Sequence, residues 1–339
     1  MPSPNPFIFG SPVTSSRFVG REAALRAVLA RLSNASREST SVVAGDRMGR
    51  TSFLRYLTSA ECRAENPELA PFVPVFFDGQ QAAAQDAQAV WLRVLQLAKR
   101  NCPDRSLDPD FDACIQAAEG GRLSAFRLED LFDRMSEQGL MLLAAVDDFH
   151  HLLANPRLGP PDSFYSDLRS LLLRLPHSLV MVVASPRQLL DLWRMGPGGS
   201  PFYNVFGTVF LGRFTPAEVD ALLDAWLEGT GVTFDAGDQA LIWEHARGHP
   251  MLTQFAASVI YDAALRGEAD RAGALAQAIR DPNGQAVMLQ RHILRTLRQE
   301  ETQLLNALLN SPAAISAEQR DKLKNLHEWG MIPPGVMEG

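Results

Sequence analysis

Apolar residues follow two different spacings along this chain. In residues 139–148 and 178–185 they run almost without interruption and end in polar residues, which is typical of parallel strands buried on both faces. Elsewhere they recur every three or four residues, which predicts amphipathic helices. We expect strands over 41–45, 72–78, 139–148, 178–185 and 204–211, and helices over 21–32, 51–57, 82–100, 128–138 and 163–175.

Strands that alternate with helices of this length predict an α/β fold, in which a parallel sheet of about five strands lies between two helical layers. After residue 213 the strand pattern ends. Thr215-Pro-Ala-Glu218 has the composition of a capping box with proline at the first helical position, so we expect a helix over 215–228. Further helices are expected over 236–246, 251–266, 270–279, 286–309 and 317–329.

Composition narrows the classes of protein. The 339 residues are 46% apolar and 21% charged, with a net charge of −7, which argues against a disordered chain or a polybasic nucleic-acid binder. Three widely spaced cysteines without a CxxC pair favour free thiols in a reducing compartment. The N-terminus lacks the cationic start of a secretory signal, and the apolar runs are too short to span a membrane. We therefore expect a cytoplasmic protein without a membrane partner.

A phosphate-binding loop is the first candidate for chemistry. The consensus is G-x-x-x-x-G-K-[ST], between a strand and a helix, where backbone N–H groups and the helix N-terminus surround phosphate oxygens. Here Gly49 and Thr51 are in register, whereas Ala44 replaces the first glycine and Arg50 replaces the lysine. We expect Thr51 to hold Mg²⁺ and Arg50 to face the β- and γ-phosphates. The predicted cofactor-binding residues here are Gly45, Asp46, Arg47, Met48, Gly49, Arg50, Thr51 and Ser52.

The arginine at this position has to be weighed against an unusual composition, because the chain contains 29 arginines and only three lysines. Arg-biased codon usage is the plain interpretation of that imbalance. A guanidinium is nevertheless larger and planar where an ammonium is a compact charge, so the exchange is not conservative at a tight site. We expect altered catalysis more than lost phosphate affinity, although an ordinary strand–helix turn is the plain alternative.

An acidic pair follows the strand expected over 139–148. Buried strands rarely end in two carboxylates, because each charge needs a cation or hydrogen bonds. In P-loop enzymes the first acid associates with Mg²⁺ and the second orients the attacking water, which assigns these roles to Asp147 and Asp148. Ser185, at the end of the next strand, is a candidate γ-phosphate sensor. His150 and His151 lack the spacing of a metal site.

Several segments in order resemble the STAND group of P-loop ATPases, relatives of origin-recognition-type AAA+ proteins. Residues 5–7 and 18–22 resemble the segment before the phosphate loop that packs near adenine, which implies nucleotide contacts for Val19, Gly20 and Arg21. Gly248-His249-Pro250 matches the Gly-x-Pro turn, whose proline contacts the base or sugar, and so implies Pro250. The resemblance implies an extended lead-in (1–16), a P-loop domain (17–213), a helical lid (214–284) and a partial winged-helix-like segment (285–339).

This resemblance implies a switch that binds ATP or ADP with Mg²⁺, self-associates or acts on a separate effector, and serves signalling or defence. Ala44, Arg50 and Asp148 depart from the usual pattern at positions that handle the γ-phosphate and water, so we expect slow or absent hydrolysis. Two alternatives stay open. One is a pseudo-ATPase scaffold for oligomerisation that binds no nucleotide. The other is a DNA-associated ATPase of origin-recognition or transposition type, which the acidic net charge disfavours.

Overall fold

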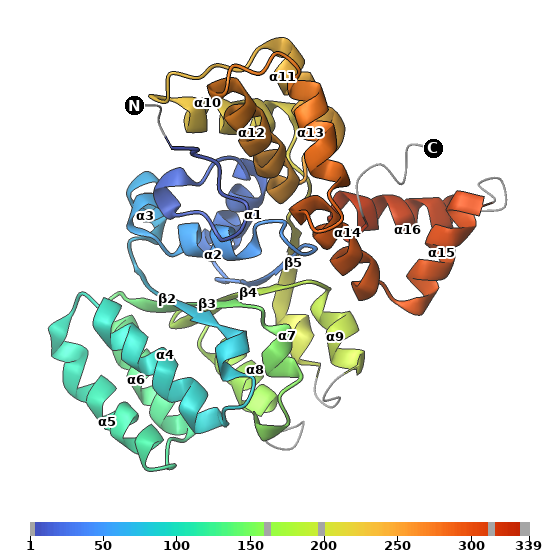
Figure 1. The fold of residues 1–339 in the computed structure, drawn as a ribbon. Helices are drawn as coiled ribbons and strands as arrows, with labels where there is room; N and C mark the ends of the chain where they lie inside the picture. The colour runs from blue at the N-terminus through green and yellow to red at the C-terminus, as the bar shows by residue number, and fades with distance from the viewer. Residues whose placement is uncertain (1–3, 159–163, 196–200, 311–315, 333–339) are drawn as a thin grey trace. The chain divides into compact units, whose positions relative to one another are not determined.

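The computed structural model of the chain describes residues 4–158, 164–195, 201–310 and 316–332. The chain divides into two compact units (Figure 1). The α/β unit comprises residues 22–43 and 50–210, and the helical unit comprises residues 1–21, 44–49 and 211–339. Among the described residues, no helix has the length and apolar character needed to cross a membrane.

A parallel sheet forms the centre of the α/β unit, and its five described strands have the order β2-β3-β4-β1-β5. The register places Val43 beside Ser185 and Val146 beside Val183. The carboxyl ends of β1, β4 and β3 therefore lie at the same edge of the sheet. The strands are β1 (Ser39–Val43), β2 (Phe72–Asp78), β3 (Met141–Asp147), β4 (Leu179–Ser185) and β5 (Phe206–Phe210).

Helices cover both faces of this sheet, which confirms the predicted α/β fold. The first three helices lie on one face and α4 to α8 on the other (Figure 1). β3 and β4 are buried along their whole length, which explains their uninterrupted apolar runs. The helices are α1 (Glu22–Ser33), α2 (Arg50–Leu57), α3 (Ala60–Glu65), α4 (Ala87–Asn101), α5 (Asp108–Glu119), α6 (Ala125–Glu137), α7 (His150–Leu153), α8 (Phe164–Arg174) and α9 (Leu189–Met195).

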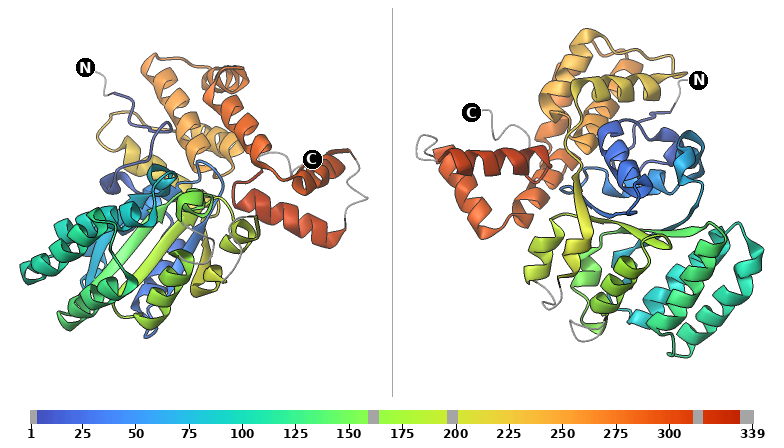
Figure 2. Two further views of the ribbon diagram at one scale, coloured as in Figure 1. Left: turned by 90° about the horizontal axis from the view of Figure 1, so that it is seen from below. Right: turned by 180° about the vertical axis from the view of Figure 1, so that it is seen from behind.

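The helical unit is organised around α12 (Pro250–Leu265), in which 12 of 16 residues are buried. A helix that is apolar nearly all round has to lie at the centre of its neighbours. Figure 2 shows the unit from two further directions. Phe7, from the lead-in, stacks on Trp226 and Phe234. Helices α11 (Ala236–Ala246), α13 (Arg271–Arg280) and α14 (Gln285–Thr296) contact α12, and the unit also contains α10 (Pro216–Leu227), α15 (Gln299–Asn310) and α16 (Ala317–Glu328).

One expected helix was wrong, and four helices were not predicted. The predicted helix over 286–309 is two helices, because Leu297 has an extended backbone and ends α14. The Glu301 carboxylate then accepts the Arg298 N–H at 2.8 Å near the start of α15, as the N3 glutamate does in a capping box. The helices that were not predicted are α3, α5, α7 and α9. The capping box predicted at Thr215 and Glu218 is present.

Candidate functional site

Thr51 and Asp147 meet at the carboxyl edge of the sheet in the α/β unit. Thr51 lies in the first turn of α2 and donates its hydroxyl to Asp147 Oδ2 at 2.5 Å. Asp147 ends β3 and is 4% exposed. Burial raises the pKa of this carboxyl, and the hydrogen bond from Thr51 partly opposes the rise. The pair is therefore a hydroxyl and a buried carboxylate, both oxygen donors, with little cationic compensation.

Oxygen donors of this kind suit Mg²⁺. Proteins usually hold this ion through one or two carboxylates, with substrate phosphates and water as the remaining ligands. Asp147 and Thr51 match that donor set, and a divalent cation would offset the desolvation that disfavours the charged form of Asp147. No group of three or more histidine, cysteine or acidic side chains suited to a metal occurs in the residues that the structure describes. Asp147 and Thr51 are the residues that would hold Mg²⁺ here.

Asp148 turns away from the strand and pairs with Arg50. Its φ is +43°, a left-handed conformation that aspartate adopts more readily than most residues. Arg50 Nη2 lies 3.0 Å from Asp148 Oδ1, and His150 Nδ1 lies 3.9 Å from the same oxygen. The residue at the lysine position and the residue predicted to orient water are thus ion-paired.

Ser185 lies at the same sheet edge, beside the end of β1. Its side chain is fully buried, and its hydroxyl donates to the Arg187 carbonyl oxygen at 2.6 Å. The structure therefore brings Arg50, Thr51, Asp147 and Asp148 into contact, and it places Ser185 on the neighbouring strand with its hydroxyl bonded within its own turn. Ser52 lies half-buried in the first turn of α2.

The loop of residues 44–49, which leads from β1 to α2, belongs to the helical unit. Arg21 is buried and donates to the carbonyl oxygens of Met48, at 2.8 Å, and Gly212. Burial lowers its pKa to about 10, and the Glu218 charge partly offsets this. Its backbone N–H donates to Glu218 Oε1 at 2.7 Å. Arg21 therefore holds the loop of residues 44–49 by a hydrogen bond to the backbone carbonyl of Met48.

The other residues predicted to bind nucleotide in the loop and in residues 18–22 contact different parts of the helical unit. Asp46 Oδ2 lies 2.8 Å from His292 Nε2. Arg47, with a φ of +59°, donates to the Gly10 carbonyl oxygen at 3.1 Å. Gly49 has a φ of +92°. Val19 packs beside the core of the helical unit, and Gly20 lies beside Phe214 and Glu218.

The Gly-His-Pro turn contains a residue that the sequence argument left without a role. Pro250 is buried as the first residue of α12. His249, immediately before it, is 0% exposed, and within the described residues neither ring nitrogen has a hydrogen-bond partner. Burial lowers its pKa to about 3, and the charges of Arg213 and Arg21 contribute in the same direction. His249 is therefore a neutral imidazole among cations.

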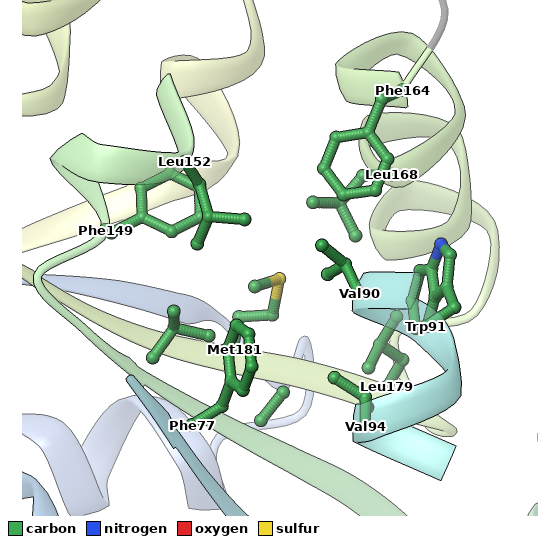
Figure 3. Close-up of a pocket in the computed structure, with 12 residues that line it drawn as sticks. Phe77, Val90, Trp91, Val94, Phe149, Leu152, Phe164, Leu168, Leu179 and Met181 are labelled. Carbon is green, nitrogen blue, oxygen red and sulfur yellow. The ribbon is translucent and has the colours of Figure 1, made fainter. Parts of the chain in front are cut away.

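A pocket in the α/β unit is unsuited to a nucleotide. Figure 3 shows its side chains, which include Phe77, Trp91, Phe149 and Met181, pointing into a gap between the sheet and α4, α7 and α8. The lining exposes no polar surface, and the cavity volume is about 30 Å³. That volume is close to the share of one water molecule in the liquid. The gap is lined by apolar side chains and offers nothing to phosphates.

Comparison with known proteins identifies the fold of the chain. No family model and no curated protein matches the sequence. Among solved structures, the Walker-type ATPase PABY2304 of Pyrococcus abyssi is similar, with a TM-score of 0.62 at 16% identity over 96% of this chain and 93% of that one. The ORC2 protein of Aeropyrum pernix gives 0.51 at 17% identity over 94% and 82%.

A RuvB variant of Thermotoga maritima gives a TM-score of 0.50 at 13% identity, over 98% of this chain and 91% of that one. At these identities the likeness concerns the fold. The chain has the fold of Walker-type P-loop ATPases, with a parallel sheet followed by a helical C-terminal region.

Proposed function

We propose that this chain binds ATP or ADP with Mg²⁺ through residues 44–52 and Asp147, and that it hydrolyses ATP slowly or not at all. The observation that carries the proposal is the pairing of the two helix residues Arg50 and Thr51 with the two acids that end β3, at 3.0 Å and 2.5 Å. A loop that leads from a strand into such a helix is a common phosphate-binding arrangement. The fold likeness to Walker-type ATPases supports the same function.

The Arg50–Asp148 ion pair supports slow hydrolysis. A carboxylate that orients attacking water has to accept a hydrogen bond from that water. Here Asp148 Oδ1 is engaged by Arg50 Nη2 and lies close to His150. Aspartate is also one methylene shorter than the more usual glutamate. Arg50 would bind the nucleotide phosphates only after its ion pair with Asp148 breaks. The pair could therefore exist in two states, with Arg50 bound either to Asp148 or to phosphate.

Equilibrium binding of fluorescent ATP and ADP analogues, with and without Mg²⁺, tests the proposal. We expect Arg50→Ala to weaken binding about tenfold or more, because a charge-assisted contact to phosphate contributes about 1.5–3 kcal/mol. Arg55→Ala is the matched control, since Arg55 is exposed on the same helix. Wild-type protein that binds neither nucleotide would favour the scaffold alternative. Fast ATP turnover that Asp147→Ala abolishes would refute slow hydrolysis.

The finer roles are also proposals. The sequence resemblance to STAND proteins supports a signalling or defence switch in the cytoplasm that self-associates or acts on an effector. The fold likeness to an ORC2 protein favours a second candidate, a DNA-associated ATPase. Arg291 and Arg295 are exposed on α14 and would contact DNA phosphates. A shift with duplex DNA that weakens steeply as salt rises would support this second candidate.

A further inference from the structure

The C-terminal segment Trp329–Ile332 contacts the loop of residues 44–49 inside the helical unit. The Gly45 N–H donates to the Trp329 carbonyl oxygen at 2.7 Å. A Cβ on Gly45 would overlap the backbone of Gly330, and a Cβ on Gly330 would overlap the side chain of Met48. Loop and segment are thus packed so closely that neither glycine position has room for a methyl group.

Arg213 holds this segment in place. Its Nε donates to the His327 carbonyl oxygen at 2.8 Å and its Nη2 to the Ile332 carbonyl oxygen at 3.1 Å. The backbone N–H of Arg213 donates to the Glu328 carbonyl oxygen at 3.0 Å. The guanidinium thus bridges the last turn of α16 and the residues beyond it. A fork of donors suits this task in a way that a single ammonium does not.

Two arginines lie close to the contact, Arg21 and Arg213. Arg21 binds the Met48 carbonyl, and His249 stays neutral beside Arg21 and Arg213. Burial also lowers the pKa of His327 to about 4, with the Arg213 charge contributing. Carbonyl oxygens of the C-terminal segment therefore accept hydrogen bonds from arginines and from a loop N–H group. The same donors would also bind the anionic oxygens of a phosphate.

We propose that the segment Trp329–Ile332 competes with nucleotide phosphates for the loop of residues 44–49, and that Arg213 keeps this competitor in position. The proposal rests on the nucleotide binding proposed above. A Trp329 carbonyl and a phosphate oxygen are both acceptors, and the Gly45 N–H already donates to the former at 2.7 Å. Phosphates are held in full only in molecules whose segment has moved away.

Gly330→Ala tests the competition. Gly330 has a φ of +71°, and the added methyl group would meet Met48. Gly267→Ala is a matched control, because Gly267 has a φ of +70° and nothing lies within 4 Å of its added Cβ. If one molecule in ten has an uncovered loop, release of the segment lowers the apparent Kd for ATP or ADP about tenfold. We expect that gain for Gly330→Ala and no gain for Gly267→Ala.

A second pair of variants guards against misfolding. Arg213→Lys keeps the charge and loses the fork, so we expect a smaller gain in nucleotide affinity than for Gly330→Ala. Arg266→Lys is its control, because Arg266 pairs with Glu268 at an exposed position of the same unit. Hydrogen–deuterium exchange of the peptide that contains Gly45, measured without nucleotide, should be faster in Gly330→Ala and Arg213→Lys than in the controls.

Three results are distinguishable. Faster exchange together with tighter nucleotide binding supports the competition. Faster exchange with unchanged nucleotide affinity overturns it and leaves the proposed nucleotide binding intact. An exposed loop in variants that bind neither ATP nor ADP overturns both proposals, because the competitor would then have nothing to compete with.

Discussion

The arginines of the two units find their hydrogen-bond partners in different ways. In the α/β unit, Arg50 pairs with the side chain of Asp148, and that carboxylate is 29% exposed. In the helical unit, Arg21 and Arg213 donate to backbone carbonyl oxygens. A phosphate can replace a carboxylate on an arginine at small cost, whereas removal of an arginine from buried carbonyls leaves those oxygens without donors. The first arrangement suits an exchangeable contact, and the second fixes the course of the chain.

The largest effect is expected where carbonyl oxygens depend on a buried arginine. Arg21→Met keeps an apolar stem of similar length but removes the donors to Met48 and Gly212. We expect the free energy of unfolding to fall by about 3 kcal/mol, at about 1.5 kcal/mol for each carbonyl that loses a charged donor. Urea denaturation at pH 7 measures this. Arg266→Met, at an exposed position, should change it little.

A loss below about 0.5 kcal/mol for Arg21→Met would contradict the comparison, since surface substitutions reach that size without any buried partner. It would mean that the loop of residues 44–49 keeps its conformation without the Met48 hydrogen bond. Arg21 would then have no positioning role, and the contrast with Arg50 would disappear.

Local patterns predicted much of the α/β unit, and long-range contacts explain what they missed. The apolar runs of β3 and β4 identified their strands, and the strand end at Asp147 and Asp148 identified the acids that the structure joins to Thr51 and Arg50. Each of those predictions depends on neighbours in sequence. The ion pair between Arg50 and Asp148 could not be predicted. Each residue departs from the consensus at its own position, and nothing in the sequence indicates that the two side chains contact each other.

The helical unit shows the limit more clearly. Arg213 bonds to a carbonyl 114 residues away in sequence, and no periodicity encodes such a partner. Gly330 follows the end of α16 with a φ of +71°, which favours glycine, but its packing on Met48 could not be predicted from the sequence. The break at Leu297 was hidden because both flanking helices continue the same apolar spacing. Sequence patterns therefore predicted elements and strand-end acids, and tertiary contacts decide which groups meet.

A smaller effect, of opposite sign, is expected at Asp147. Burial raises its pKa in the folded state, so the charged form destabilises the folded protein above that pKa, and the penalty vanishes below the unfolded pKa, where both states are protonated. Asp147→Asn should therefore raise Tm at pH 7 and converge with wild type as pH falls toward 4. It should also weaken Mg²⁺-dependent nucleotide binding. Thermal denaturation across this pH range checks the sign.

Equal Tm values for Asp147→Asn and wild type at pH 7 would show that the hydrogen bonds from Thr51 and from the Asp148 N–H fully compensate the buried charge. The Asp147 carboxylate would then act only as a hydrogen-bond acceptor. Its burial would leave no unfavourable charge for a cation to offset, and the proposed Mg²⁺ site would lose that support. Thr51→Val in the Asp147→Asn background separates the contribution of the hydroxyl from that of the charge.

The smallest effect is expected for the Arg50–Asp148 pair itself. A double-mutant cycle with Arg50→Met and Asp148→Asn should give a coupling free energy of about 0.5–1 kcal/mol, because the pair is partly exposed and solvent screens it. Asparagine tolerates the left-handed conformation of Asp148, so the cycle isolates the charge. Added salt should reduce the coupling. A coupling above about 2 kcal/mol would make Arg50 a fixed structural cation like Arg21, held too firmly for nucleotide phosphates to displace Asp148.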